Sequence, residues 1–73
     1  MRRYTVNLIP DDDGGYSVMV PAFPNIHTCG DTIADALAMA QDAIELYVGY
    51  LRDEGEPIPD DVTQTTAVVE VAA

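Results

Sequence analysis

The chain has 73 residues, with 13 acidic side chains against three basic ones and a formal net charge of −10. A chain of this length buries only about 60% of its unfolded surface, so residues 1–73 are expected to form one small domain. Phosphate backbones require clustered cations, so nucleic-acid binding by this chain alone is disfavoured. A basic protein partner fits the charge better, although acidity that only keeps a small domain soluble explains the composition equally well.

The sequence favours a cytoplasmic protein. Cys29 is the only cysteine, so no internal disulfide can form. No apolar run of the length that spans a bilayer is present, and residues 1–4 lack the apolar stretch of a secretion signal.

Three short strands are expected before residue 30. Residues 3–9 alternate apolar and polar side chains, which is the period of a half-buried strand, and Pro10 ends it. Aspartates and glycines at 11–15 predict a hairpin loop. Residues 16–20 then form a second strand and residues 26–29 a short third one.

A proline-bracketed corner and one long helix follow from the next residues. Pro21 and Pro24 enclose Phe23, which predicts a corner between the second and third strands. Thr32 is a good N-cap, and Asp35 three residues later completes a capping-box pattern. The apolar residues that follow are spaced by three and four, as on one face of a helix: Ile33, Ala36, Leu37, Ala40, Ile44, Tyr47, Val48 and Leu51.

The end of the helix and a last strand complete the predicted fold. Gly55 is a natural residue after a helix and Pro57 blocks its continuation, so the helix should be about 20 residues long. Residues 66–72 alternate as a final strand, with Val69 and Val71 on one face and Val68 on the other. We predict a two-layer α+β fold: a three-stranded antiparallel meander, one long helix and a final strand, in the order β-β-β-α-β.

The residue types needed for a metal site or for catalysis are mostly missing. His27 and Cys29 share one face of a strand, but a structural zinc site needs four ligands and no second pair exists. The contiguous acids 11–13 do not have the alternate spacing of a calcium loop. Asp31 and Asp35 serve a helix start better than a two-metal centre. We therefore predict no metal, no cofactor and no enzymatic activity.

The order of these motifs resembles the HicB-type antitoxin family. The resemblance rests on Gly15-Tyr16, the corner 21–24, Gly30-Asp31-Thr32, residues 35–37 and the Gly-x-Pro-Ile-Pro run at 55–59. Asn25 stands where the family usually has glycine, and asparagine also tolerates the left-handed region. The resemblance covers nearly the whole chain up to Pro59.

The resemblance implies a partial RNase H-like fold without nuclease activity. It also implies binding to a small basic HicA-type toxin, which cleaves RNA and whose active surface the antitoxin covers. Many family members carry a C-terminal DNA-binding domain; residues 66–72 end this chain as a strand, so we expect no DNA binding by this chain alone. The expected partner contacts are the hairpin acids, the aromatic residue after them and two acids of the helix: Asp11, Asp12, Asp13, Tyr16, Asp35 and Asp42.

Self-association is expected through the final strand, which carries Val68, Val69 and Val71 and has Glu70 as its only charged residue. Such a strand is a pairing template when it lies at a sheet edge, and no Lys or Pro protects it. A homodimer or a homotetramer would close the edge. The alternative function is a homo-oligomeric accessory or small-molecule-binding domain that has no toxin partner.

Overall fold

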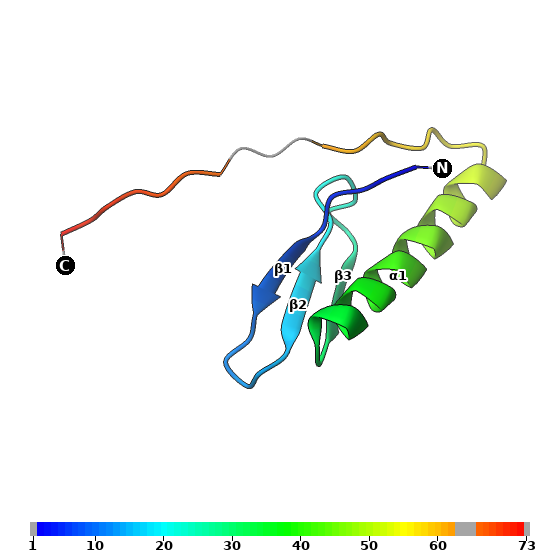
Figure 1. Ribbon diagram of the computed structural model, residues 1–73. Helices are drawn as coiled ribbons and strands as arrows, with labels where there is room; N and C mark the ends of the chain where they lie inside the picture. The colour runs from blue at the N-terminus through cyan, green and yellow to red at the C-terminus, as the bar shows by residue number, and fades with distance from the viewer. Residues whose placement is uncertain (1, 63–65, 73) are drawn as a thin grey trace.

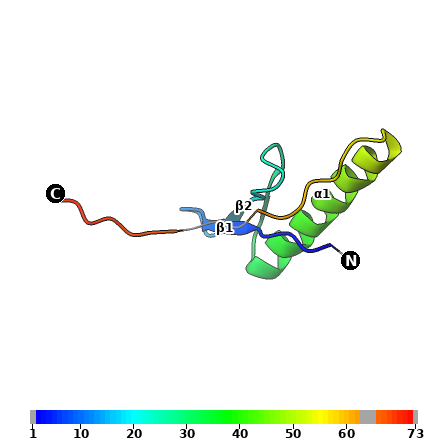
Figure 2. The ribbon, with the colours of Figure 1, turned by 90° about the horizontal axis from the view of Figure 1, so that it is seen from above.

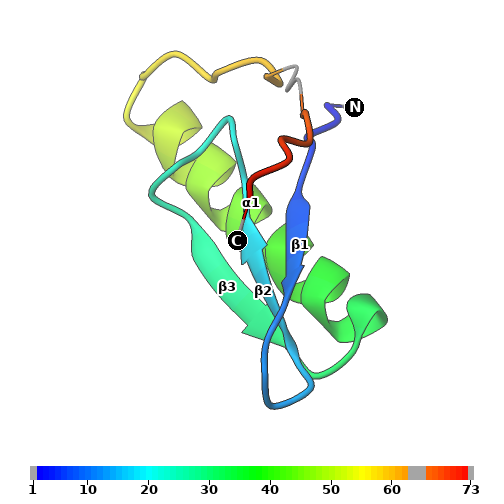
Figure 3. The same cartoon turned by 90° about the vertical axis from the view of Figure 1, so that its left-hand side faces the viewer.

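The computed structural model describes residues 2–62 and 66–72, and Figure 1 shows their arrangement. Strands β1 (Asn7–Pro10), β2 (Tyr16–Met19) and β3 (His27–Gly30) are followed by helix α1 (Ile33–Asp53). The strands form one antiparallel sheet in the order β1-β2-β3. Helix α1 lies on one face of this sheet, so the predicted α+β meander with one long helix is confirmed (Figure 3).

The strand register separates a covered face from an open face. Leu8, Val18 and Thr28 are opposite one another across the three strands, and Val18 is fully buried under the helix. The neighbouring row of Met19 and His27 lies on the other face, where both side chains are exposed. This alternation is the usual pattern of a sheet that packs against a helix on one side only.

Strand β1 starts later than the alternation of residues 3–9 predicts. Its first partner pair joins Asn7 to Met19, and the chain beyond Met19 turns into the corner at Pro21. Residues 3–6 therefore have no residue of β2 opposite them. Pro10 is the last residue of β1 and is paired with Tyr16. The proline therefore belongs to the strand that it ends.

The main core is built around the corner residue Phe23, which is 1% exposed. The Phe23 N–H donates to Val20 O at 3.0 Å and the Ile26 N–H donates to Phe23 O at 2.9 Å, so two turns point the ring inwards. Its centroid lies 4.9 Å from that of Tyr4 and 5.5 Å from that of Tyr47, the latter edge to face. Tilted aromatic pairs at these separations add to the stabilisation that burial gives.

A second, smaller cluster holds the start of the helix close to the sheet. Val18, Ala36 and Ala40 are its buried members. Gly30 lies against the helix backbone: an added Cβ there would come within 2.7 Å of Ala36 Cα and 2.8 Å of the carbonyl carbon of Asp35. Only glycine allows this approach, because any side chain would overlap main-chain atoms that cannot move aside.

Both ends of α1 are capped as predicted. The Asp35 N–H donates to Thr32 Oγ1 at 3.0 Å, which satisfies one unpaired donor of the first turn. At the other end Gly55 has a φ of +70°, with its N–H donating to Arg52 O and the Glu56 N–H donating to Leu51 O. This pair of bonds is the Schellman arrangement, which satisfies carbonyls of the last turn.

After the helix the chain returns beside its own N-terminal segment. Tyr4 Oη donates to Pro59 O at 2.6 Å. The Thr5 N–H and its hydroxyl donate to the two carboxylate oxygens of Asp61, at 2.8 and 2.7 Å. Residues 59–61 thus run alongside residues 4 and 5 in the same direction (Figure 1).

The predicted final strand does not form within this single chain. Residues 66–72 belong to no strand, and they extend away from the sheet and the helix (Figures 1 and 2). Val68 is 94% exposed and Val69 and Val71 are 80% exposed. The sequence has the strand pattern, but a strand requires a neighbour that bonds to its backbone, and the described residues offer none to this segment.

Replacing Gly30 with alanine should destabilise the fold by at least about 2 kcal/mol, because the methyl group overlaps the backbone of Ala36. Gly49→Ala is the matched control: its Cβ meets nothing within 4 Å, and alanine in a helix interior stabilises by about 0.5–1 kcal/mol. Urea unfolding followed by circular dichroism measures both changes. Equal effects of the two substitutions would show that α1 does not lie against Gly30.

The bonds from Thr5 should make the junction at Asp61 sensitive to acid. The Thr5 N–H, followed by its hydroxyl, lowers the pKa of the Asp61 carboxyl. A lowered folded-state pKa contributes stability above the unfolded value, near pH 4, which is lost as the pH falls through the folded value. We expect the NMR chemical shift of the Thr5 amide proton to change as the pH falls below about 4 and the Asp61 carboxylate is protonated. Asp61→Asn should abolish this change. Asp60→Asn is the control, and an unchanged titration in Asp61→Asn would contradict the assignment.

Candidate partner-binding surface

The fold gathers acids at one end of the molecule. The hairpin loop of residues 11–15 and the connection from β3 to α1 lie side by side, because Tyr16 is paired with both Pro10 and Gly30. We call the group Asp11, Asp12, Asp13, Asp31 and Asp35 the acidic end. Asp31 belongs to this end although the sequence analysis did not place it among the partner contacts. Its proximity comes from strand pairing, which residue spacing does not reveal.

Two of the predicted contact residues also have structural roles. Asp11 closes the hairpin loop: its N–H donates to Gly15 O at 2.8 Å, and its carboxylate accepts from Ser17 Oγ at 2.9 Å. Tyr16 is half-buried and packs against the cluster of Val18 and Ala36. Asp12 and Asp13 are exposed at the tip of the loop and are the freer of the hairpin acids for contact with another protein.

One face of α1 alternates acids with exposed apolar side chains. At 100° per residue, positions 35, 39, 42, 46, 50 and 53 fall within one arc of about 80° on the helix surface. Met39 is 50% exposed, Leu46 77% and Tyr50 57%. We call this set, on α1, the mixed face; its members are Asp35, Met39, Asp42, Leu46, Tyr50 and Asp53. The predicted contacts Asp35 and Asp42 are thus brought together with a row of apolar residues.

The apolar members of the mixed face were missed at the sequence level. They lie outside the longer apolar stripe of the helix. Their own spacing is nevertheless helical, because Met39, Leu46 and Tyr50 are separated by seven and four residues. Tyr50 is positioned by its neighbours: its ring stacks on Tyr47 with centroids 6.1 Å apart, and Tyr47 packs edge to face on the buried Phe23. An aromatic side chain held in place before binding loses little freedom when it enters an interface.

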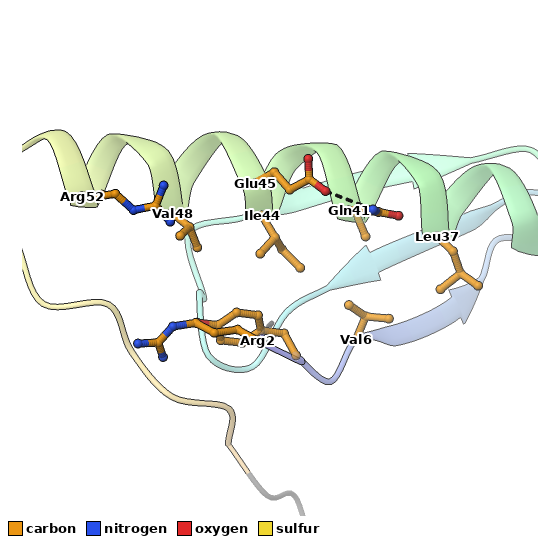
Figure 4. Close-up of a pocket in the computed structure, with 10 residues that line it drawn as sticks. Arg2, Val6, Leu37, Gln41, Ile44, Glu45, Val48 and Arg52 are labelled. Carbon is orange, nitrogen blue, oxygen red and sulfur yellow. Dashed lines mark hydrogen bonds between the residues drawn. The ribbon is translucent and has the colours of Figure 1, made fainter.

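The opposite side of α1 faces an open groove beside β1. The helix packs mainly on β3 and then on β2, so the covered face of the sheet near β1 is only partly filled. The groove has a volume of about 850 Å³, and Arg2, Tyr4 and Val6, which precede β1, line one side of it (Figure 4). Helix α1 lines the other side with the apolar Leu37, Ile44 and Val48 and with the polar Gln41, Glu45 and Arg52. Leu37 is 44% exposed, although it belongs to the periodic apolar stripe that the sequence predicts for one face of the helix.

The described residues contain no cluster of side chains that could hold a metal ion. In residues 2–62 and 66–72, no three His, Cys, Asp or Glu side chains come together as they would around a metal ion. His27 and Cys29 are both exposed on the open face of β3. The same described ranges contain no helix with the length and apolar character of a membrane span. The arrangement is suited to contact with another macromolecule through the mixed face and the acidic end.

Comparison with known proteins decides the family. The sequence model of the HicB-like antitoxin of bacterial toxin–antitoxin systems matches residues 4–72. The chain belongs to this family. The resemblance stated from the motifs is confirmed, and the matched range extends beyond Pro59 into the C-terminal segment.

Individual relatives differ in how much of their length this HicB-like chain covers. A UPF0150 protein of Thermoplasma acidophilum is 39% identical over 66 residues, which is 90% of this chain and 96% of that protein. Antitoxin HicB 2 of Photorhabdus laumondii is 41% identical over 97% of this chain but only 50% of its own length. Antitoxin HicB of Escherichia coli K12 is 32% identical over 94% of this chain and 51% of its own. The chain thus spans about half of the length of these two HicB antitoxins.

Proposed function

We propose that this chain binds a small basic HicA-type toxin that cleaves RNA, and neutralises it by covering the toxin's active surface. Membership of the antitoxin family supports a toxin partner. The observation that carries the proposal is the mixed face of α1, where exposed apolar side chains alternate with carboxylates. This combination suits a basic protein surface, because apolar anchors supply affinity and opposite charge speeds the encounter.

The two kinds of residue have different roles in the proposed complex. Leu46 and Tyr50 are the anchors, because they are large, exposed and close together on the helix. Asp42 lies one turn before Leu46, and the acidic end lies at the start of the helix. Their negative charge raises the association rate with a basic toxin. The open face of the sheet, with Met19 and His27, lies outside the proposed contact.

Substitutions on the mixed face should weaken the complex in two distinguishable ways. Tyr50→Ala and Leu46→Ala should each raise the dissociation constant for the toxin at least about tenfold, mainly through faster dissociation. Asp42→Lys should instead slow association and reduce its salt dependence. Surface plasmon resonance with a small basic HicA-type toxin as the partner measures both rates.

Met19→Ala is the matched control, because Met19 is about as exposed as Met39 but lies on the open face of the sheet. It should leave both rates unchanged. Absence of any complex at low salt, with both proteins folded by circular dichroism, would overturn the proposal. That outcome would favour the alternative of a homo-oligomeric accessory or small-molecule-binding domain, for which the groove beside β1 is the candidate site.

A protein that acts by binding a toxin should be inert towards nucleic acids on its own. The covered row of the sheet, Leu8, Val18 and Thr28, carries no carboxylate that could hold magnesium. Arg2 is paired with Asp60 at 3.1 Å, and Arg52 lies at the far end of α1. We expect no magnesium-dependent cleavage of an RNA–DNA hybrid and no gel shift of promoter DNA at physiological salt. Cleavage that Asp31→Asn abolishes would contradict the first expectation, and a specific shift would contradict the second.

A further inference from the structure

The groove between the N-terminal segment and α1 contains most of the positive charge of the chain. Its lining includes Arg2 and Arg52 but only one acid, Glu45. The whole chain has three basic side chains and 13 acidic ones. Two of the three cations therefore lie on this one surface, where an anionic group meets attraction although the chain as a whole repels it.

The groove has a cationic end and an apolar end. Figure 4 shows Arg2 and Arg52 towards the C-terminal end of α1, and Val6 and Leu37 towards its start. The Ile44 side chain projects from the helix into the space between these two ends (Figure 4). A molecule that lay along the groove would thus have positive charge at one of its ends and aliphatic side chains along the rest.

Both guanidinium groups have donors to offer an anion. Arg2 Nη1 lies 3.1 Å from Oδ1 of Asp60, whose side chain is 96% exposed, so this ion pair is a weak surface contact. It uses one of the five N–H donors of the guanidinium. Arg52 is exposed, and no carboxylate in residues 2–62 and 66–72 forms an ion pair with it.

The one acid of the lining does not enter the groove. Gln41 Nε2 donates to Glu45 Oε1 at 3.0 Å, which ties the carboxylate to the neighbouring turn of the helix. Figure 4 shows the Glu45 carboxylate directed away from the N-terminal segment, whereas Ile44 is directed towards it. The apolar part of the groove therefore carries no competing negative charge.

The wall opposite α1 is held in place by the rest of the chain. Tyr4 packs on the buried Phe23 with ring centroids 4.9 Å apart, and its hydroxyl donates to Pro59 O at 2.6 Å. Thr5 makes two further bonds to Asp61. Sites for small molecules are mostly formed before the ligand binds and have volumes of about 300–1,000 Å³. The groove, at about 850 Å³, is of this size.

We propose that the groove binds a small amphipathic carboxylate, with its head on Arg2 and Arg52 and its aliphatic body along Val48, Ile44 and Val6. Arginine pairs with a carboxylate through two parallel N–H···O bonds, which fixes the head. The body is stabilised because it and the aliphatic side chains are removed from water together. The mixed face is on the other side of α1, so this site does not depend on the proposed toxin contact.

Decanoate, used below the concentration at which it forms micelles, is the probe for the site. In methyl NMR spectra it should cause saturable shift changes at Val6, Ile44 and Val48 and none at Leu46, which is on the mixed face. Decyltrimethylammonium has a similar body with a cationic head and should bind at least about tenfold more weakly. Each CH₂ added from butyrate to decanoate should tighten binding about twofold or more, because it buries apolar surface.

The head contact is tested by a pair of substitutions with the same change in net charge. Arg52→Gln should weaken decanoate binding at least about tenfold, because the charged bonds to the head are lost. Arg3→Gln is the matched control, since Arg3 is exposed and does not line the groove. It should leave the dissociation constant within about twofold, because a distant exposed charge is screened by salt. Arg52→Gln should also leave the gain per CH₂ unchanged, since the body keeps its contacts.

Each outcome decides the proposal. No saturable change with decanoate, in a chain folded by circular dichroism, would show that the groove takes no such ligand. Equal changes at Leu46 would show general adsorption to exposed apolar side chains. Equal weakening by Arg52→Gln and Arg3→Gln would exclude a carboxylate site at Arg52, and affinity independent of chain length would exclude the apolar contact. These measurements use this chain alone, so their failure leaves the toxin proposal standing.

Discussion

The close approach of Gly30 to the backbone at Ala36 fixes where α1 lies, and the other features of the molecule follow from that position. With alanine at 36 and 40 the helix rests directly on Val18, so it covers β3 and β2 more than β1. The large ring of Phe23 fills the space farther along the helix. The same placement that seals one side of the sheet leaves the groove beside β1 open.

The two sides of α1 consequently have different characters. The side towards the groove combines apolar residues with Gln41, Glu45 and Arg52. The mixed face combines carboxylates with the exposed Leu46 and Tyr50. Charge would act in opposite directions on the self-association that the sequence predicts and on association with a basic partner. Two copies that each carry a net charge of −10 repel, so salt favours their pairing, whereas salt screens the attraction of a basic partner. Ionic strength alone can therefore separate the two associations experimentally.

Patterns of a few neighbouring residues were sufficient to predict the helix caps and the corner between the strands. They were insufficient to predict what packs beside each strand and helix. Thr32, Gly55 and the prolines around Phe23 each act within a few residues, so the caps and the corner could be predicted from the sequence. The start of β1 depends on where β2 ends, and the acidic end depends on which loops strand pairing brings together. Leu37 belongs to the periodic stripe but is half exposed, because periodicity gives a face of the helix and not the extent of the sheet beneath it. Residues 66–72 have the pattern of a strand, but the described residues of the chain supply no neighbouring strand for them.

The exposed state of residues 66–72 has a consequence for how long the protein would persist. Proteases bind their substrates as extended chains, and an unpaired terminal segment is a preferred site of cleavage. A strand of any partner that bonds to this segment would leave it no free backbone for a protease to bind. The rate at which a protease cleaves residues 66–72 would then report how much of the segment is paired, and so link the lifetime of the protein to its binding partners.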